Sequence, residues 1–104
     1  MLIKQAVDEF KERLKALYTQ RLKELVIYGS CARGDATDKS DIDLLVVLKG
    51  KVFPGEEIDR MIDAITEVNL KYGVLLSVYP VSEKDFENLN SPLLINVRRE
   101  GVRA

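Results

Sequence analysis

The sequence predicts a small α/β domain in which a β-sheet packs against helices mainly on one face. Two observations carry this prediction: apolar residues recur at helical spacing in two long segments, and short, strongly apolar segments lie between the helices. The chain has 104 residues, and a domain of this size can bury a core without disulfides. We therefore expect residues 1–104 to form a single domain.

Apolar periodicity predicts two amphipathic helices. In the first, residues 2–19, the intervals of three and four place the apolar side chains on one helical face. The second is expected from Glu56 to Lys71, with Gly73 as its C-cap. The apolar positions of the first helix are Ile3, Val7, Phe10, Leu14 and Leu17.

Three apolar segments read as strands: Leu25–Tyr28, Ile42–Leu48 and Val74–Tyr79, the last closed by Pro80. Beyond Asp43 the second segment is apolar at every position. A strand of this kind is typical of the middle of a sheet that is covered on both sides.

A last helix is predicted to begin at Ser91-Pro92 and to end near Gly101. Its apolar side chains fit core packing most simply, and a subunit interface is the alternative. Three arginines close to the C-terminus form either a solvated helix end or a small basic patch, namely Arg98, Arg99 and Arg103.

Composition excludes several classes of function. The formal net charge is −1, which argues against direct nucleic-acid binding, because such proteins normally carry a basic excess. The chain has one cysteine and no histidine, so an internal disulfide, a Cys/His zinc site and histidine catalysis are all excluded. No apolar run approaches the roughly 20 residues that span a bilayer, and the N-terminus does not resemble a signal peptide. We expect a cytoplasmic protein.

The candidate site centres on Asp41 and Asp43, which are two positions apart at the start of a strand. Residues with this spacing face the same side of a sheet, where two carboxylates can hold a hard divalent cation together. Asp41 alone would also fit an ordinary loop exit. Asp43 does not, because it lies between Ile42 and Leu44, where an unpaired carboxylate would be costly to desolvate.

Gly29-Ser30 forms a small-residue turn at the end of the preceding strand. Backbone N–H groups and a hydroxyl in such a turn can bind phosphate. A glycine also commonly ends a strand without binding any ligand, and no Walker A sequence follows this one. Taken together with the two aspartates, the turn indicates chemistry on a metal-bound nucleotide.

These residues resemble a known family. Gly29-Ser-Cys-Ala-Arg-Gly34, a short spacer and Ser40-Asp-Ile-Asp-Leu-Leu-Val46 are similar to the signature of the minimal nucleotidyltransferases, small relatives of the DNA polymerase beta superfamily. The resemblance implies the small nucleotidyltransferase fold, with a mixed sheet of three or four strands.

The resemblance also implies the roles of individual residues. Asp41 and Asp43 would be the catalytic carboxylates and would bind Mg²⁺, with Mn²⁺ as the alternative ion. The phosphates of ATP or another nucleoside triphosphate would contact Gly29, Ser30, Arg33 and Ser40. For Arg33, a surface ion pair with Asp35 or Asp38 is an equal alternative. Cys31 is assigned no chemistry.

One position departs from the family pattern. The family places a third acid on the next strand, and here the polar residue of that strand is Ser77. Serine cannot take the proton of an attacking hydroxyl. Loss of a general base typically costs ~10²–10⁴ in rate, and Glu83 and Asp85 lie too far along the chain to replace it.

Three functions follow as alternatives. The first is a Mg²⁺-dependent transferase that moves a nucleotide, with AMP from ATP preferred, to a hydroxyl acceptor such as a protein. The resemblance implies a HEPN-type helical partner, in a toxin–antitoxin or two-subunit system, or a homo-oligomer. The second is a weak or inactive nucleotide-binding partner subunit, since Ser77 replaces the third acid. The third is an α/β interaction module without a nucleotide site.

Overall fold

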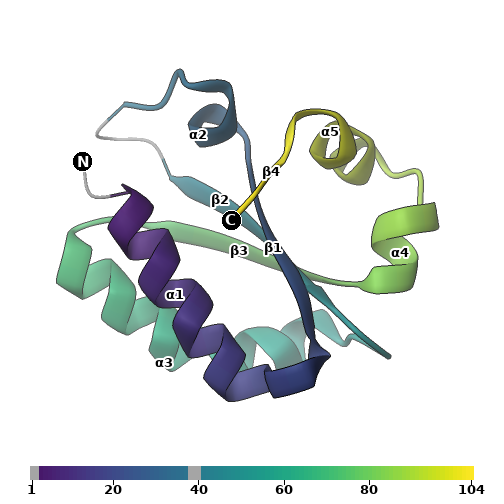
Figure 1. Ribbon diagram of the computed structural model, residues 1–104, viewed down its shortest axis with the longest axis horizontal. Coiled ribbons are helices and arrows are strands. Elements are labelled where there is room, and N and C mark those ends of the chain that lie inside the picture. Colours follow the sequence, from purple (N-terminus) through teal and green to yellow (C-terminus); the bar gives the residue numbers. More distant parts are fainter. Residues whose placement is uncertain (1–2, 38–40) are drawn as a thin grey trace.

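The computed structural model describes residues 3–37 and 41–104. The chain forms a sheet with helices on both of its faces (Figure 1). In chain order the elements are α1 (Ile3–Tyr18), the 3₁₀ turn η1 (Thr19–Arg21), β1 (Leu22–Tyr28), α2 (Ser30–Arg33), β2 (Ile42–Leu48), α3 (Pro54–Tyr72), β3 (Leu76–Ser82), α4 (Glu83–Asn88), α5 (Pro92–Glu100) and β4 (Val102–Arg103).

The sheet is mixed and its strand order is β3-β2-β1-β4. Strand β2 runs antiparallel to β1 and parallel to β3, and β4 adds an antiparallel edge to β1. The prediction of a mixed α/β sheet with β2 inside it is therefore confirmed. The parallel pair β2–β3 is connected through the long helix α3, as parallel strands require a crossover.

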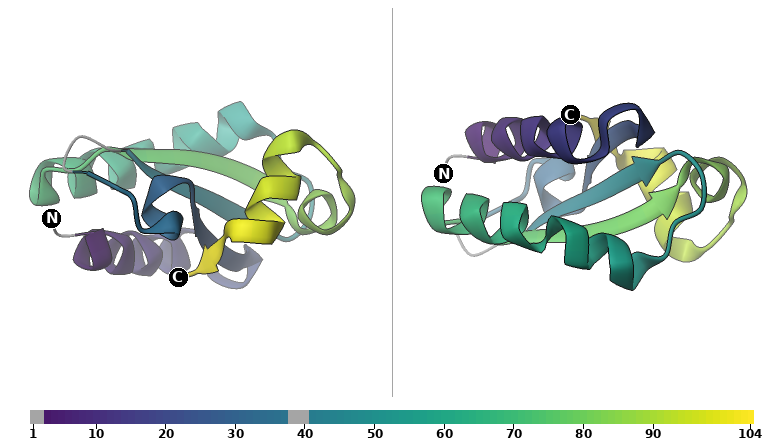
Figure 2. Two further views of the ribbon diagram at one scale, coloured as in Figure 1. Left: turned by 90° about the horizontal axis from the view of Figure 1, so that it is seen from above. Right: turned by 90° about the horizontal axis from the view of Figure 1, so that it is seen from below.

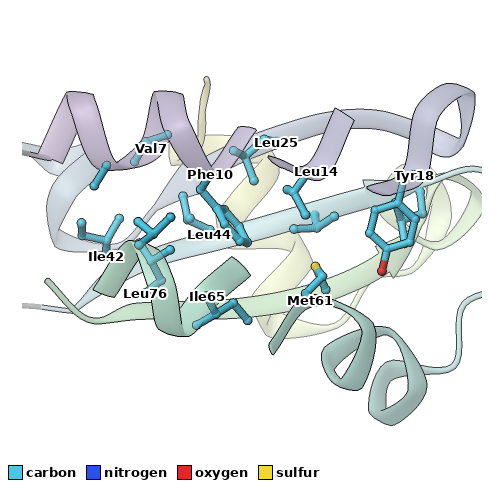
Figure 3. Packing of buried hydrophobic residues seen from close by; sticks show 14 residues of the cluster. Val7, Phe10, Leu14, Tyr18, Leu25, Ile42, Leu44, Met61, Ile65 and Leu76 are labelled. Carbon is cyan, nitrogen blue, oxygen red and sulfur yellow. The ribbon is translucent and has the colours of Figure 1, made fainter. Parts of the chain in front are cut away.

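The larger part of the core lies between one face of the sheet and the helices α1 and α3, which lie side by side across that face (Figure 2). Phe10 and Leu14 of α1 and Met61 of α3 pack over Leu44 and other inward side chains of the strands (Figure 3). These four side chains are completely buried. Burial of each such side chain contributes on the order of 1.5–3 kcal/mol.

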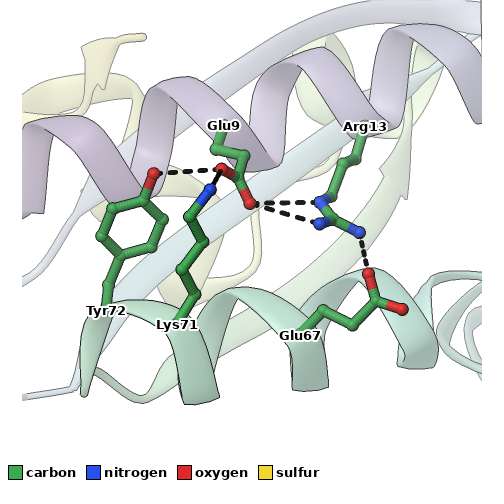
Figure 4. A network of polar contacts seen from close by, with 5 residues as sticks. All are labelled: Glu9, Arg13, Glu67, Lys71 and Tyr72. Atoms are coloured by element: carbon green, nitrogen blue, oxygen red, sulfur yellow. Dashed lines mark hydrogen bonds and ion pairs between the residues drawn. The ribbon is translucent and has the colours of Figure 1, made fainter.

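Polar contacts on the solvent side fix α1 against α3 (Figure 4). Glu9 accepts hydrogen bonds from Lys71 Nζ at 2.6 Å, Tyr72 Oη at 3.0 Å and Arg13 Nε at 3.3 Å. Arg13 also pairs with Glu67. This network spans the two helices on the face of the sheet opposite to α5.

The other face of the sheet is only partly covered. Helices α4 and α5 pack over one end of it, where Leu94 and Val97 meet Val26, Leu45 and Val47. This face also includes Asp43 on β2 and Ser77 on β3, near the start of the two strands and next to the part that is covered, and these side chains are half-buried and exposed respectively. Within the described residues, no helix combines the length and apolar character needed to cross a membrane.

Three strands differ from the expectation. Strand β1 begins at Leu22 rather than Leu25. The third strand begins at Leu76 rather than Val74 and continues through Pro80 to Ser82. Proline is tolerated there because β3 is an edge strand, which has no second neighbour that needs the missing N–H. The two-residue strand β4 was not predicted at all, since its sequence is too short to show a periodicity.

The helix ends follow the expected chemistry. Gly73 ends α3 with φ 63°, in the left-handed region that favours glycine. Ser91 accepts a hydrogen bond from the Leu94 N–H at 3.2 Å and thereby caps α5. The predicted helix at Glu56–Lys71 begins two residues earlier, at Pro54, because proline fits the first helical turn.

Candidate functional site

Asp43 occupies the second position of the central strand β2. In the register of the sheet it lies directly between Tyr28 of β1 and Ser77 of β3. All three side chains therefore face the same side of the sheet, and adjacent strands are about 4.8 Å apart. Asp43 is thus in the middle of a polar row at the open end of this face.

Because Gly29 has no side chain, it leaves space for the carboxylate of Asp43. The residue has φ 71° and ψ −149°, a backbone conformation that essentially only glycine adopts. A Cβ atom at position 29 would overlap Oδ2 of Asp43. Any side chain there would both strain the turn and displace the carboxylate, so Gly29 couples the turn after β1 to the site on β2.

Asp41 and Asp43 oppose each other electrostatically. Asp41 is exposed and lies immediately before β2, at the entrance to the open end of the sheet. Burial raises the pKa of Asp43 above its ordinary value, and the neighbouring Asp41 carboxylate raises it further, against the opposing effect of the Arg33 guanidinium. The two carboxylates thus act on one small region, and a cation there would relieve the repulsion between them.

A single helical turn, α2, follows Gly29. The Arg33 N–H donates to the Gly29 carbonyl and the Asp35 N–H donates to the Ser30 carbonyl, both at 3.1 Å. The Cys31 thiol donates to the carbonyl of Asp41 at 3.8 Å and so connects α2 to the start of β2. Burial raises the pKa of this thiol above its ordinary value.

Arg33 ends α2 and, among the residues that the structure describes, forms two ion pairs. Its Nε atom donates to Oδ2 of Asp35 at 3.3 Å, and its Nη1 atom lies 3.5 Å from Oε2 of Glu100 at the end of α5. The expected surface pair with Asp35 is therefore present, whereas Asp38 lies outside the described residues. Because Arg33 also acts on Asp43, the guanidinium is close enough to the site to influence it.

The remaining predicted positions are Ser40 and Ser77. Ser40 lies outside the described residues. Ser77 is exposed and is the register neighbour of Asp43. Among residues 3–37 and 41–104, no three acidic or cysteine side chains gather closely enough to hold a metal ion.

The donor set suits a hard divalent cation. Two carboxylates supply hard oxygen ligands and leave the other positions of an octahedral ion to water and phosphate oxygens. Mg²⁺ at nucleotide sites is typically held in this way. The residues present therefore suit a cation that arrives together with a nucleotide better than one held permanently by protein ligands alone.

The sequence profile of the nucleotidyltransferase domain matches residues 7–102. The chain belongs to this nucleotidyltransferase family. The match extends from α1 to β4, so it covers the sheet, the turn after β1 and both aspartates.

Two relatives come from Methanocaldococcus jannaschii, and each is named "Putative protein adenylyltransferase". The first is 41% identical over 97 residues, which are 92% of this chain and 91% of the relative. The second is 33% identical over 87 residues, which are 81% of this chain and 58% of that longer protein.

The fold also has a solved counterpart, the "Crystal structure of a putative nucleotidyltransferase from Sulfolobus solfataricus". The two chains superpose with a TM-score of 0.57 over 97% of this chain and 83% of the other, at 22% sequence identity. This likeness supports the nucleotidyltransferase-type fold of the family.

Three features of the site were not predicted. The sequence marked Gly29 as a turn, but its contact with Asp43 depends on how β1 and β2 pair. Tyr28 was assigned only to a strand. Glu100 carried no signal, because 67 residues separate it from Arg33 along the chain.

Proposed function

We propose that this nucleotidyltransferase transfers AMP from ATP to a hydroxyl group of a protein, with Mg²⁺ as the preferred ion and Mn²⁺ as a substitute. The observation that carries the proposal is the position of Asp43, a partly buried carboxylate opposed by Asp41 at the open end of the sheet. The names of the two relatives favour a protein acceptor.

In the proposed reaction the acceptor oxygen forms a bond to the α-phosphorus of ATP. The bond from that phosphorus to the pyrophosphate breaks, and the acceptor proton is released. Asp41 and Asp43 would hold the metal ion, which when bound supplies charge stabilisation for the reacting phosphates. Gly29, Ser30 and Arg33 would orient the phosphates, and the proposal keeps Ser40 in the same role.

The side of the proposed site that would activate the acceptor hydroxyl lacks a carboxylate. Ser77 stands next to Asp43, and a serine cannot accept the proton of the attacking hydroxyl as a carboxylate can. This observation favours a second candidate function, a subunit that binds nucleotide but transfers it slowly or not at all. For the transferase, the substrate or a partner chain would supply the missing group.

We propose that this second chain is a HEPN-type helical partner, with the present chain as its antitoxin or small subunit, and that a homo-oligomer is the alternative. The support is the family resemblance described above, together with the Ser77 end of the sheet, which the described helices leave open.

The test uses the chain purified from its native host together with whatever copurifies with it. The complex is incubated with labelled ATP and Mg²⁺, and transfer of label to protein is measured. The proposal predicts metal-dependent label on the partner. ATP binding without label on any partner would reject the transferase in favour of the nucleotide-binding subunit.

The variant Ser77→Asp tests the assignment of the acceptor side. A carboxylate at this position would restore a general base beside Asp43, and transfer should rise at least about 10-fold, below the ~10²–10⁴ of an optimised base. Tyr79→Asp, two residues further along β3, is the matched control and should give no gain. Equal gains in both variants would refute a specific role for position 77.

A further inference from the structure

Within residues 3–37 and 41–104, two carboxylates contact Arg33, each through a different nitrogen atom. Asp35, two residues away, accepts from Nε at 3.3 Å. Glu100 approaches Nη1 from another element, α5, at 3.5 Å, which is an ion pair rather than a close hydrogen bond. The two contacts therefore differ: Asp35 orients the guanidinium from its own loop, and Glu100 occupies one of the two terminal nitrogens.

The terminal nitrogens are the atoms that a phosphate would need. An arginine that binds phosphate commonly donates two parallel N–H bonds from one edge of the guanidinium. While Glu100 holds Nη1, one of these donors is engaged. Moreover, Arg33, Asp35 and Glu100 together carry a net charge of −1, which repels a polyphosphate.

Glu100 is in an unfavourable place for a carboxylate. It is the last residue of α5, where the helix dipole favours cations, and it follows Arg98 and Arg99, which suit that end. The next residue, Gly101, packs closely on β1: its N–H donates to the Val97 carbonyl at 2.7 Å, and a Cβ at position 101 would meet the Val26 side chain at 2.5 Å. A change of side-chain rotamer at Glu100 would be enough to release Arg33.

We infer that Glu100 competes with nucleotide phosphate for Arg33 and thereby limits the affinity of this site for nucleoside triphosphates. The inference rests on the proposed function, in which Arg33 binds phosphate. Glu100 is a residue that acts through Arg33, without contact to the nucleotide. The position of α5, which covers the neighbouring part of the sheet, is in this way linked to nucleotide binding.

The experiment is a calorimetric titration of the full chain with ATP in excess Mg²⁺. Glu100→Gln removes the competing charge and keeps the size of the side chain. Because exposed ion pairs contribute about 0.2–1 kcal/mol, the dissociation constant should fall by a factor between about 1.4 and about 5. Glu87→Gln, the same change at an exposed position on α4, should leave the constant unaltered.

A second pair of variants separates this mechanism from a general loss of negative charge. In a chain that already carries Arg33→Gln, adding Glu100→Gln should not change ATP affinity further, because the shared partner is gone. An equal gain in that background would overturn the inference, as would unchanged or weaker binding by the single variant. If the unaltered chain binds ATP and Glu100→Gln does not change its affinity, only the inference about Glu100 fails. If the unaltered chain binds no ATP at all, the proposed function fails as well.

Discussion

Two carboxylates on neighbouring elements, Glu57 and Asp43, have opposite surroundings. Glu57 on α3 is 2% exposed, yet Tyr18 Oη donates to its Oε1 at 3.0 Å, and Arg60 and Arg21 lie 3.4 and 3.6 Å from its oxygens. Asp43 is more exposed but faces another carboxylate, and its pKa is raised by burial and by Asp41.

The difference separates a structural acid from a candidate functional one. Glu57 has a hydrogen-bond donor, Tyr18, and two guanidinium groups around its carboxylate. At Asp43, burial and the nearby Asp41 carboxylate disfavour the negative charge, and the Arg33 guanidinium opposes this effect only in part. Carboxylates held in this way are typical of sites that bind a cation or move a proton.

The comparison of Glu57 with Asp43 predicts that removal of the two charges changes the free energy of unfolding in opposite directions. This is the largest effect that we expect. Glu57→Gln removes the charge that Arg21, Arg60 and Tyr18 surround, and should lower the free energy of unfolding by about 1–3 kcal/mol. Asp43→Asn removes an opposed charge and should raise that free energy at pH 7 without divalent metal. Urea denaturation in the presence of EDTA measures both.

The pH dependence follows from the raised pKa of Asp43. The fold favours the protonated carboxyl, so ionisation costs stability as the pH rises through that pKa, and the stabilising effect of Asp43→Asn should disappear below about pH 4, the ordinary range of the group. Asp63→Asn, at an exposed position on α3, is the control for charge removal. A destabilising effect of Asp43→Asn at pH 7 would contradict the comparison.

A smaller effect tests the surroundings of Glu57. Burial raises the pKa of Tyr18 to about 12, and the Glu57 carboxylate raises it as well. The stabilisation by the protonated phenol should therefore be complete below about pH 10, the ordinary value, and should be lost as the pH rises towards about 12. The stability difference between the unaltered chain and Tyr18→Phe should shrink over that interval. A difference that stays constant would refute the role given to this phenol.

How much the sequence predicts depends on the range of the interaction. Strand Ile42–Leu48 was predicted to the residue, because its apolar run and its two aspartates are local signals. The family and the candidate metal ligands came from the same short segment. These features need only neighbours along the chain.

Features that depend on pairing between distant segments were missed. Pro80 was taken as the end of a strand, whereas β3 continues through it because no strand follows on that side. The burial of Glu57 depends on Tyr18, which is 39 residues away, and a glutamate on a helix is usually exposed. The ion pair between Arg33 and Glu100 likewise depends on how α5 packs on the sheet.

The most direct test of the central claim is a titration of ATP into the unaltered chain and into Asp43→Asn, each with and without Mg²⁺. If Asp41 and Asp43 form the metal-dependent half of a nucleotide site, the unaltered chain should bind ATP much more tightly with Mg²⁺. Asp43→Asn should lose most of that gain, and Asp63→Asn should keep it. ATP binding that is independent of Mg²⁺ and unchanged by Asp43→Asn would contradict the account.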